Sequence, residues 1–240
     1  MIKNMGLIAL LLGLINPYLQ AEEIKVGFHD FPPMMIKHSN TGIYKEIFSE
    51  LTKRTGDRYI TLYSSAARIN EQFIKGAVDI EPGIAPIWRA HTDVPGVFSE
   101  PFKKSEVILL FAPGKAFPYT SVNDLIGKEV GAVRGYHYSG FGNLITTGKI
   151  KRVDSVSEEQ LINFLGAGRI NVILIEKSVA LFHMSLQKKL GRLEQGSVYE
   201  SADIAMRVHP RKTHILKAMN KALGEMKRQG VIDEIYLRYQ

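Results

Sequence analysis

Short apolar runs alternate along the chain with longer segments in which apolar residues recur every three or four positions. In one longer segment, GIYKEIFSELTKRTG, Ile43, Ile47 and Leu51 have helical spacing and Gly56 ends the pattern. The two patterns predict, in order, a strand at 24–29, a helix at 42–56, a strand at 59–64, a helix at 67–76 and a strand at 77–83. Strands that alternate with helices favour a parallel α/β sheet.

A proline-rich segment interrupts this alternation. EPGIAPIWRAHTDVPGVFSEPF, at 81–102, holds four prolines and the only tryptophan of the chain, and it is predicted to be a loop. The alternation then starts again, with Ser157 and Gln160 placed for a capping box at the start of a helix. The alternating pattern restarts at 121–135. The later predicted strands lie at 106–113, 171–176 and 202–208, and the later predicted helices lie at 157–168, 214–229 and 231–239.

The sequence repeats one of its own transitions. FIKGAVDI at 73–80 and FLGAGRINVI at 164–173 both run from phenylalanine through a helix end and a glycine into a strand. Two α/β units of similar design explain this repetition better than one long sheet does. We expect one lobe from 22–110 with 204–240 and a second from 111–203. The apolar strands at 106–113 and 202–208 would cross between them as a hinge, with a ligand cleft between the lobes.

The N-terminus has the pattern of an export signal. Lys3 precedes an apolar run from Met5 to Ile15, which is too short to span a bilayer, and a small residue follows at Ala21. We therefore expect a signal peptide at 1–21 and a periplasmic protein. The absence of cysteine excludes disulfides and a lipid anchor.

Composition excludes several other classes of function. The formal net charge is +7, but the basic residues are scattered, and export removes nucleic acid as a partner. His183, His209 and His214 lack the spacing of a metal site, so we expect neither a metal nor a cofactor. No later segment is long and apolar enough to cross a membrane.

Several segments together resemble the periplasmic solute-binding proteins of the polar amino-acid type, which serve ABC importers. These are DFPPM after the first strand, Gly42 with Glu46, FIKGAVD, Arg89 followed by VFSEPF, VNDLIGKEVGAVRG, LGAGRINVILIE and the terminal MKRQGVIDEIYLRY. The resemblance covers the mature chain through the order and spacing of these segments. It implies a two-lobed type II periplasmic-binding-protein fold, α/β in class, that acts as a monomer.

The resemblance also implies roles for particular residues. Arg89 stands where the family clamps the ligand's α-carboxylate, a task suited to the planar fork of guanidinium. Glu176 stands where the family binds the α-ammonium, Phe31 flanks the ligand, and Trp88 supplies a second aromatic face or packs in the lobe. The candidate ligand-binding set is Arg89, Glu176, Phe31, Trp88, Tyr136, Gly83, Tyr138 and Asp30.

The chain also departs from the family pattern. Pro86 stands near the family's threonine, Gly135 and Tyr136 replace its Gly-Thr, and Glu176 is longer than the usual aspartate. These departures favour a small amino-acid-like or carboxylate-bearing ligand other than a standard amino acid. Tyr136 either meets the ligand or packs within its lobe, and Arg134 is a possible internal partner of Glu176.

Three functions remain open at this level. The first is a binding protein that delivers its ligand to the membrane permease of an ABC importer. The second is a sensor subunit for a membrane signalling protein. The third is an enzyme similar to cyclohexadienyl dehydratases, which is disfavoured because Val179 stands where those enzymes carry a glutamate acid. We therefore predict that the protein is not an enzyme.

Overall fold

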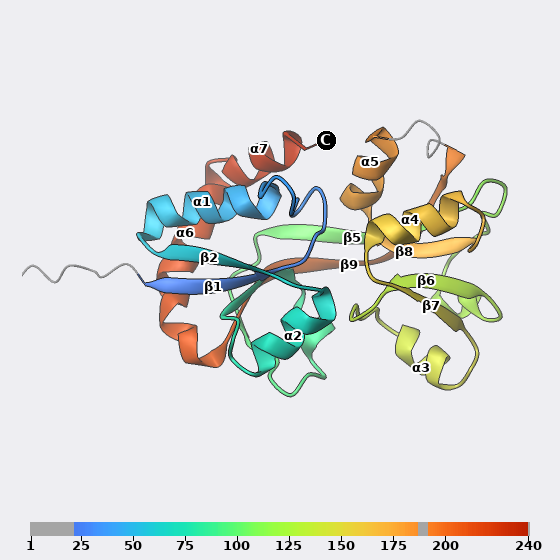
Figure 1. Cartoon of the computed structure of the whole chain (residues 1–240), viewed down its shortest axis with the longest axis horizontal. Helices are drawn as coiled ribbons and strands as arrows, with labels where there is room; N and C mark the ends of the chain where they lie inside the picture. Colours follow the sequence, from blue (N-terminus) through green and yellow to red (C-terminus); the bar gives the residue numbers. More distant parts are fainter. Residues whose placement is uncertain (1–21, 187–191, 240) are drawn as a thin grey trace, which may run out of the picture.

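The computed structural model describes residues 22–186 and 192–239, and these fold into two α/β lobes side by side (Figure 1). The predicted signal peptide at 1–21 lies outside the described residues. We call the elements in the next sentence the first lobe. They are β1 (Glu23–Phe28), α1 (Ile43–Thr55), β2 (Arg58–Tyr63), α2 (Ala66–Ile74), β3 (Ile80–Ile84), a 3-10 turn (Pro86–Arg89), β4 (Val97–Phe98), a second 3-10 turn (Pro210–Ile215), α6 (Leu216–Arg228) and α7 (Val231–Leu237).

The second lobe is built on the other side of two connecting strands. The connecting strands are β5 (Lys103–Phe111) and β9 (Glu194–Val208). The second lobe comprises a 3-10 turn (Val122–Leu125), β6 (Glu129–Val133), α3 (Phe141–Thr146), β7 (Lys151–Ser155), α4 (Glu158–Gly166), β8 (Val172–Glu176) and α5 (Lys177–Leu186). The proposed lobe divisions at 110–111 and 203–204 fall within β5 and β9.

The described strands follow one path in the order β2-β1-β3-β9-β5-β8-β6-β7, with β4 beside β9. Strands β2, β1 and β3 are mutually parallel, and so are β8, β6 and β7. Between these two parallel sheets, β9 and β5 pair antiparallel with each other and with their outer neighbours. The predicted α/β class is confirmed, and two antiparallel strands make the connection between the two lobes.

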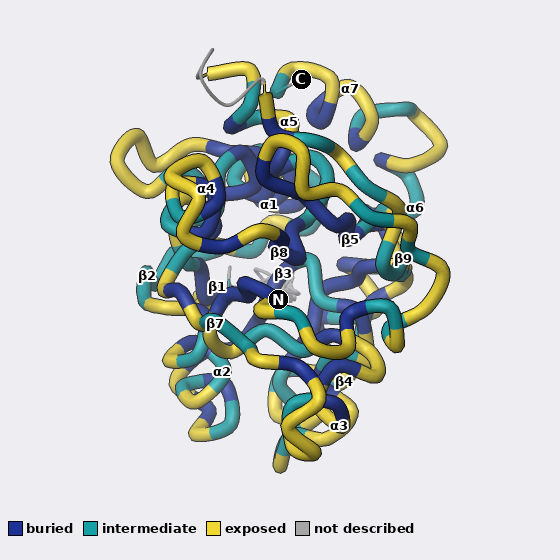
Figure 2. Tube along the Cα trace, turned by 90° about the vertical axis from the view of Figure 1, so that its right-hand side faces the viewer, coloured by how far each residue is buried: buried dark blue, intermediate teal, exposed yellow. Residues whose placement is uncertain are grey.

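Each lobe has its own hydrophobic core. In the first lobe, α1, α6 and α7 pack together against the sheet, so the C-terminal helices return to the N-terminal half (Figure 1). In the second lobe, alternate residues of β5 enter opposite faces of the sheet: Ile108 and Leu110 pack toward α4 and α5, and Leu109 and Phe111 toward α3. This period of two with both faces buried explains the continuous apolar run that predicts the strand. Figure 2 shows the buried residues of the chain in dark blue, with β5 among them.

The repeated transition in the sequence corresponds to a repeated structure. Gly76 follows α2 and Gly168 follows α4, each with positive φ, at 70° and 66°. The next residue donates its N–H back into the helix in both cases, from Ala77 to Gln72 and from Arg169 to Phe164. Such left-handed helix ends favour glycine because it has no Cβ. Both turns then lead into the strand that lies beside the connecting strands.

Two helices and a strand of five or more residues have no counterpart in the sequence-based prediction. They are α3, β7 and α5. The segment at 81–102, predicted to be a loop, also holds the 3-10 turn Pro86–Arg89 and the two-residue strand β4, and β9 begins at Glu194, well before the predicted 202. The first half of β9 alternates exposed and partly buried residues, so it lacks an apolar run. The predicted capping box is present in part: Ser157 accepts from the N–H of Gln160, but the Gln160 side chain accepts from Val156. None of the helices described is both long and apolar enough to cross a membrane.

Candidate functional site

A cavity of about 110 Å³ lies between the lobes. It is lined by residues at or after the carboxyl ends of β1, β3, β6 and β8 and by residues of the connecting strands. The carboxyl ends of parallel strands are where open α/β sheets bind ligands, and here two such edges face each other. The volume is sufficient for several water molecules or a small organic solute.

Seven of the eight candidate residues line this cavity, namely Phe31, Gly83, Trp88, Arg89, Tyr136, Tyr138 and Glu176. Asp30 does not; it is exposed, and its carboxylate accepts from the N–H of Lys37 at 2.9 Å within the loop. Gly83 has a φ of 69°, and a Cβ there would lie 2.0 Å from the hydroxyl oxygen of Tyr44. Glycine at this position therefore lets the Tyr44 ring reach the cavity wall.

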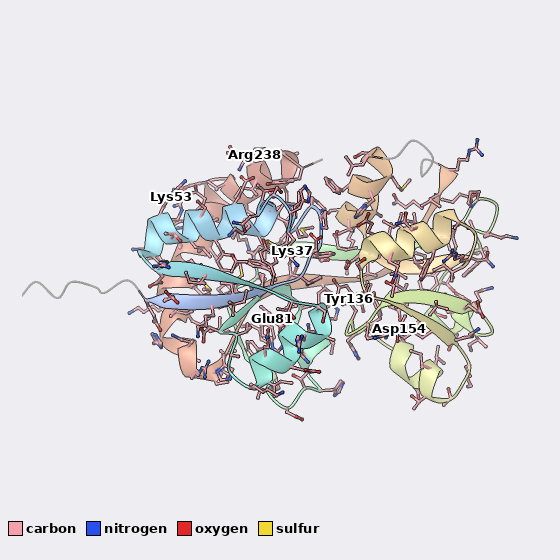
Figure 3. The ribbon with its side chains drawn as sticks, in the orientation of Figure 1. Lys37, Lys53, Glu81, Tyr136, Asp154 and Arg238 are labelled. Atoms are coloured by element: carbon pink, nitrogen blue, oxygen red, sulfur yellow. The ribbon has the colours of Figure 1, made fainter. Side chains whose placement is uncertain are left out.

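Arg89 is buried on the first-lobe wall, where it already has a carboxylate partner. Its Nε lies 3.5 Å from Glu81 Oε2 and its Nη2 lies 3.4 Å from Glu81 Oε1. The same carboxylate is bonded by Arg207 of β9, which is fully buried. Two guanidinium groups thus share one carboxylate, and Figure 3 shows Glu81 in the first lobe, toward its boundary with the second. The cluster keeps one net positive charge.

Arg207 holds the middle of the 81–102 segment in place. Its Nε donates to the Pro95 carbonyl at 2.8 Å and its Nη1 to the Asn70 side chain at 2.8 Å. Its Nη2 donates to the Thr92 hydroxyl at 3.1 Å and to a backbone carbonyl, that of Val94. The guanidinium of Arg207 is therefore a structural brace, whereas Arg89 has longer and fewer bonds and keeps free donor capacity beside the cavity.

Trp88 lies at a junction between the lobes. Its indole Nε1 donates to Glu200 Oε1 of β9 at 3.0 Å, and Glu200 Oε2 accepts from the N–H of Ser139 in the second lobe, also at 3.0 Å. Glu200 therefore connects the first-lobe tryptophan to a second-lobe loop through one carboxylate. The ring of Trp88 still lines the cavity and packs against the first-lobe core, so both interpretations of this residue are compatible with its position.

Glu176, at the end of β8, has neutral hydrogen-bond donors only. Val179 donates its N–H at 3.0 Å and Ser178 its hydroxyl at 3.3 Å. No ion pair joins Glu176 to a cation in the part of the chain that the structure describes, and Arg134 is not its partner. Burial raises the pKa of the Glu176 carboxyl to about 7.

Glu158 is a second buried acid on the same wall, and the sequence-based prediction missed it. It is the first residue of α4, is 2% exposed, and lines the cavity. Burial raises the pKa of its carboxyl to about 7, and the nearby Glu176 and Asp30 charges act in the same direction. Acidic residues are common in the first turn of a helix because they interact favourably with the helix dipole. The position of Glu158 in the sequence therefore does not indicate a ligand site.

Tyr136 joins Glu158 to the first lobe. Its hydroxyl donates to Glu158 Oε1 at 2.5 Å, and His29 Nε2 lies 2.6 Å from the same hydroxyl oxygen. Because the hydroxyl hydrogen goes to Glu158, the Nε2 of His29 donates, which fixes its tautomer. Burial lowers the pKa of His29 to about 4, so the imidazole is neutral at pH 7. This chain of bonds links the two lobes beside the cavity, and Figure 3 shows Tyr136 near the boundary between them.

A wider open space of about 500 Å³ adjoins the cavity and shares Trp88, Arg89, Tyr136 and His137 with it. Basic side chains dominate its lining: Arg89, His91, Arg134, His137 and Arg152 are there with one acid, Asp154. The His91 and His137 rings, one from each lobe, are 6.0 Å apart. The approach to the cavity is therefore basic. Within the described residues there is no cluster of ligating side chains that fits a metal ion.

Two α/β lobes joined by two antiparallel strands around an interlobe cavity define the two-lobed type II periplasmic-binding-protein fold, and the predicted fold is confirmed. No family model and no curated protein matches the chain. Among solved structures, an ancestral arginine-binding protein bound to arginine is similar with a TM-score of 0.75 and 20% identity, over 90% of this chain and 97% of that one.

Two further structures have the same fold. The GluR0 ligand-binding core in complex with L-glutamate has a TM-score of 0.76 and 19% identity, over 92% of this chain and 99% of that one. A substrate-binding protein of an ABC uptake transporter from Streptococcus pneumoniae, with bound histidine, has a TM-score of 0.75 and 19% identity, over 90% and 92%. At these identities the likeness shows the fold alone.

Proposed function

We propose that this protein is a solute-binding protein that captures a small amino-acid-like or carboxylate-bearing ligand between its lobes. The observation that carries the proposal is the meeting of unlike charges across one cavity, with Arg89 on the first lobe and Glu176 on the second. A ligand that bridges both groups makes contacts that an open cleft does not offer, so it favours the closed state.

The structural neighbours support this proposal because their structures contain bound amino acids. One was solved with arginine, one with L-glutamate and one with histidine, and the last belongs to an ABC uptake transporter. We infer delivery to the permease of an ABC importer as the output, with the mature chain acting as a monomer in the periplasm. Trp88, Phe31, Tyr136 and Tyr138 would enclose the apolar part of the ligand. Capture requires no chemistry on the ligand.

A thermal-shift screen of the purified protein against amino acids, opines, polyamines and aromatic acids tests this function. Mass spectrometry of any ligand released from freshly purified protein identifies which compounds to screen first. A compound that binds with micromolar affinity should raise the melting temperature when it is present in large excess. The Arg89→Ala variant should lose most of that shift for carboxylate-bearing compounds, because the Glu81–Arg207 pair that remains has no net positive charge to attract a carboxylate. Arg58→Ala is the matched control, since Arg58 is exposed on β2.

An unchanged melting shift in Arg89→Ala would remove Arg89 from the site, and a complete lack of stabilisation by any compound would contradict the binding function. The partner is tested separately. Cross-linking of the ligand-loaded protein to membranes of the source cells should recover a permease with its ATPase. Recovery of a membrane signalling protein instead would favour the sensor function.

A further inference from the structure

We propose that Glu158 and Glu176 form a cation-binding subsite at the second-lobe end of the cavity, and that the ligand carries a protonated amine or amidine group there. The inference rests on the proposed function, because it concerns the ligand of the same cavity. It adds a second carboxylate, Glu158, to the one that the sequence assigns to the ligand. The second-lobe wall then has two carboxylates, and the Arg89–Glu81–Arg207 cluster on the first-lobe wall has one net positive charge. This balance points to a ligand with net positive charge.

The first argument is the unmatched half of the Glu158 carboxylate. Its Oε1 accepts from Tyr136, but its Oε2 is buried and has no hydrogen-bond partner in the described part of the chain. Buried carboxylate oxygens are normally paired, because an ionised carboxylate loses its hydration on burial. The protein therefore leaves an acceptor unsatisfied on a wall of the cavity.

The second argument is the charge around the two acids. Both acids line the same cavity, and the charge of Glu176 raises the pKa of the Glu158 carboxyl, so the two carboxylates repel each other when both are ionised. The charged groups that face them include Asp30, whose effect on Glu158 is also repulsive, and Glu106, whose effect on Glu176 is repulsive but whose side chain pairs with Lys177. A positive ligand group would remove both repulsions at once.

The basic groups nearby do not supply that positive charge. Arg89 is bonded to Glu81 on the opposite wall, Lys104 lines the cavity from an exposed position on β5, and His29 is neutral at pH 7. His137 also lines the cavity, and burial lowers the pKa of its imidazole. Tyrosines lie near the two acids: Tyr44 and Tyr236 feel the charge of Glu176, and Tyr136 and Tyr138 that of Glu158. Phenol rings around two carboxylates are well suited to a cation, which they attract through the ring faces.

The experiment compares ligands that differ in charge but hardly in shape. L-Arginine and L-citrulline form one pair, L-lysine and L-norleucine another, and agmatine is a cation that lacks the carboxylate. Isothermal titration calorimetry at pH 8 should show the cationic member of each pair binding at least about tenfold more tightly than its neutral counterpart. The Glu158→Gln variant should reduce that ratio to about threefold or less, because the amide keeps the size and the acceptor for Tyr136 but not the charge. Glu159→Gln, the same change on the adjacent exposed residue, should leave the ratio unaltered.

A second readout separates ligand contact from a merely structural role of Glu158. At pH 7 the binding of a cation should release protons from the carboxyls, so the enthalpy measured in phosphate and in Tris should differ for arginine but not for citrulline. Neutral or anionic ligands that bind as tightly as the cationic probes, or cationic binding that Glu158→Gln leaves intact, would overturn the subsite while the binding function stands. If neither the probes nor the released ligand bind, the proposed function itself fails.

Discussion

The two walls of the cavity differ in whether their carboxylates are paired with cationic side chains of the protein. On the first-lobe wall, Glu81 lies between Arg89 and Arg207 and compensates one of their two positive charges within the protein. On the second-lobe wall, Glu158 and Glu176 receive hydrogen bonds from hydroxyl and N–H donors, and no cation of the described residues pairs with them. A charge that is compensated inside the protein stabilises the fold, whereas an uncompensated one is available to the ligand.

Because of this difference, Arg89 and Glu176 are not equivalent as ligand-binding groups. The sequence treats them as two equivalent clamps for a zwitterion. In the structure, Arg89 makes long bonds of 3.4 and 3.5 Å to Glu81 and shares that carboxylate with Arg207. One positive charge is left for an incoming carboxylate, against two negative charges opposite. The first-lobe wall thus combines a structural brace with a single anion site.

The largest effect is expected when the Arg207 guanidinium is removed. Arg207→Met would leave several acceptors, among them the Pro95 carbonyl and the Asn70 amide, without their donor and would reduce the compensation of Glu81. Removing one partner of a buried ion pair costs about 3–5 kcal/mol of the free energy of unfolding. Equilibrium unfolding in urea measures the loss. Arg58→Met, at an exposed position, should change the free energy by less than about 0.5 kcal/mol. A loss of similar size in both variants would show that Arg207 is not a brace.

A smaller effect is expected where the two walls meet. Tyr136→Phe removes the hydroxyl that bonds His29 and Glu158, and it leaves two buried polar groups without that partner. We expect a loss of about 1–3 kcal/mol and a larger radius of gyration of the ligand-free protein by small-angle X-ray scattering. Tyr63→Phe is the control, because its hydroxyl donates to Asn40 at 3.0 Å within the first lobe. An unchanged radius in Tyr136→Phe would mean that this bond chain does not hold the lobes together.

The sequence predicts the fold well because its signals are local. Apolar runs in buried strands, helical spacing in α1 and the glycine ends of α2 and α4 each depend on neighbouring residues only. The missed elements are short or half-exposed, as α3 and the first half of β9 are, so their patterns are weak.

The site is predicted less completely than the fold. Seven of the eight candidate residues line the cavity because the resemblance places them at strand ends, where loops meet. The compensation of Arg89 by Glu81 and the exposure of Glu158 to the cavity depend on contacts between distant segments. Glu158 and Tyr136 are 22 residues apart, and Glu81 and Arg207 are 126 apart. Only the folded chain reveals which charges neutralise each other.

The smallest expected effect tests the second-lobe wall in the absence of ligand. Burial raises the pKa of Glu158 from 4.5 to about 7, so between these pH values the folded state binds more protons than the unfolded state. The free energy of unfolding therefore falls as pH rises from 4.5 to 7, by at most about 3 kcal/mol at 1.4 kcal/mol per pH unit. Glu158→Gln removes this loss, but its amide hydrogens lack a partner, which costs about 1 kcal/mol or more.

We therefore expect Glu158→Gln to be about 1–2 kcal/mol more stable than the natural sequence at pH 8, and no more stable at pH 4.5. His29 acts in the opposite sense, because burial lowers its pKa from 6.5 to about 4 and it contributes stability that is lost as pH falls through this window. Since both proteins contain His29, its contribution cancels in the difference between them. Urea unfolding at the two pH values measures that difference. A variant that is less stable at pH 8 would show that the Glu158 charge is compensated, and the contrast between the walls would then disappear.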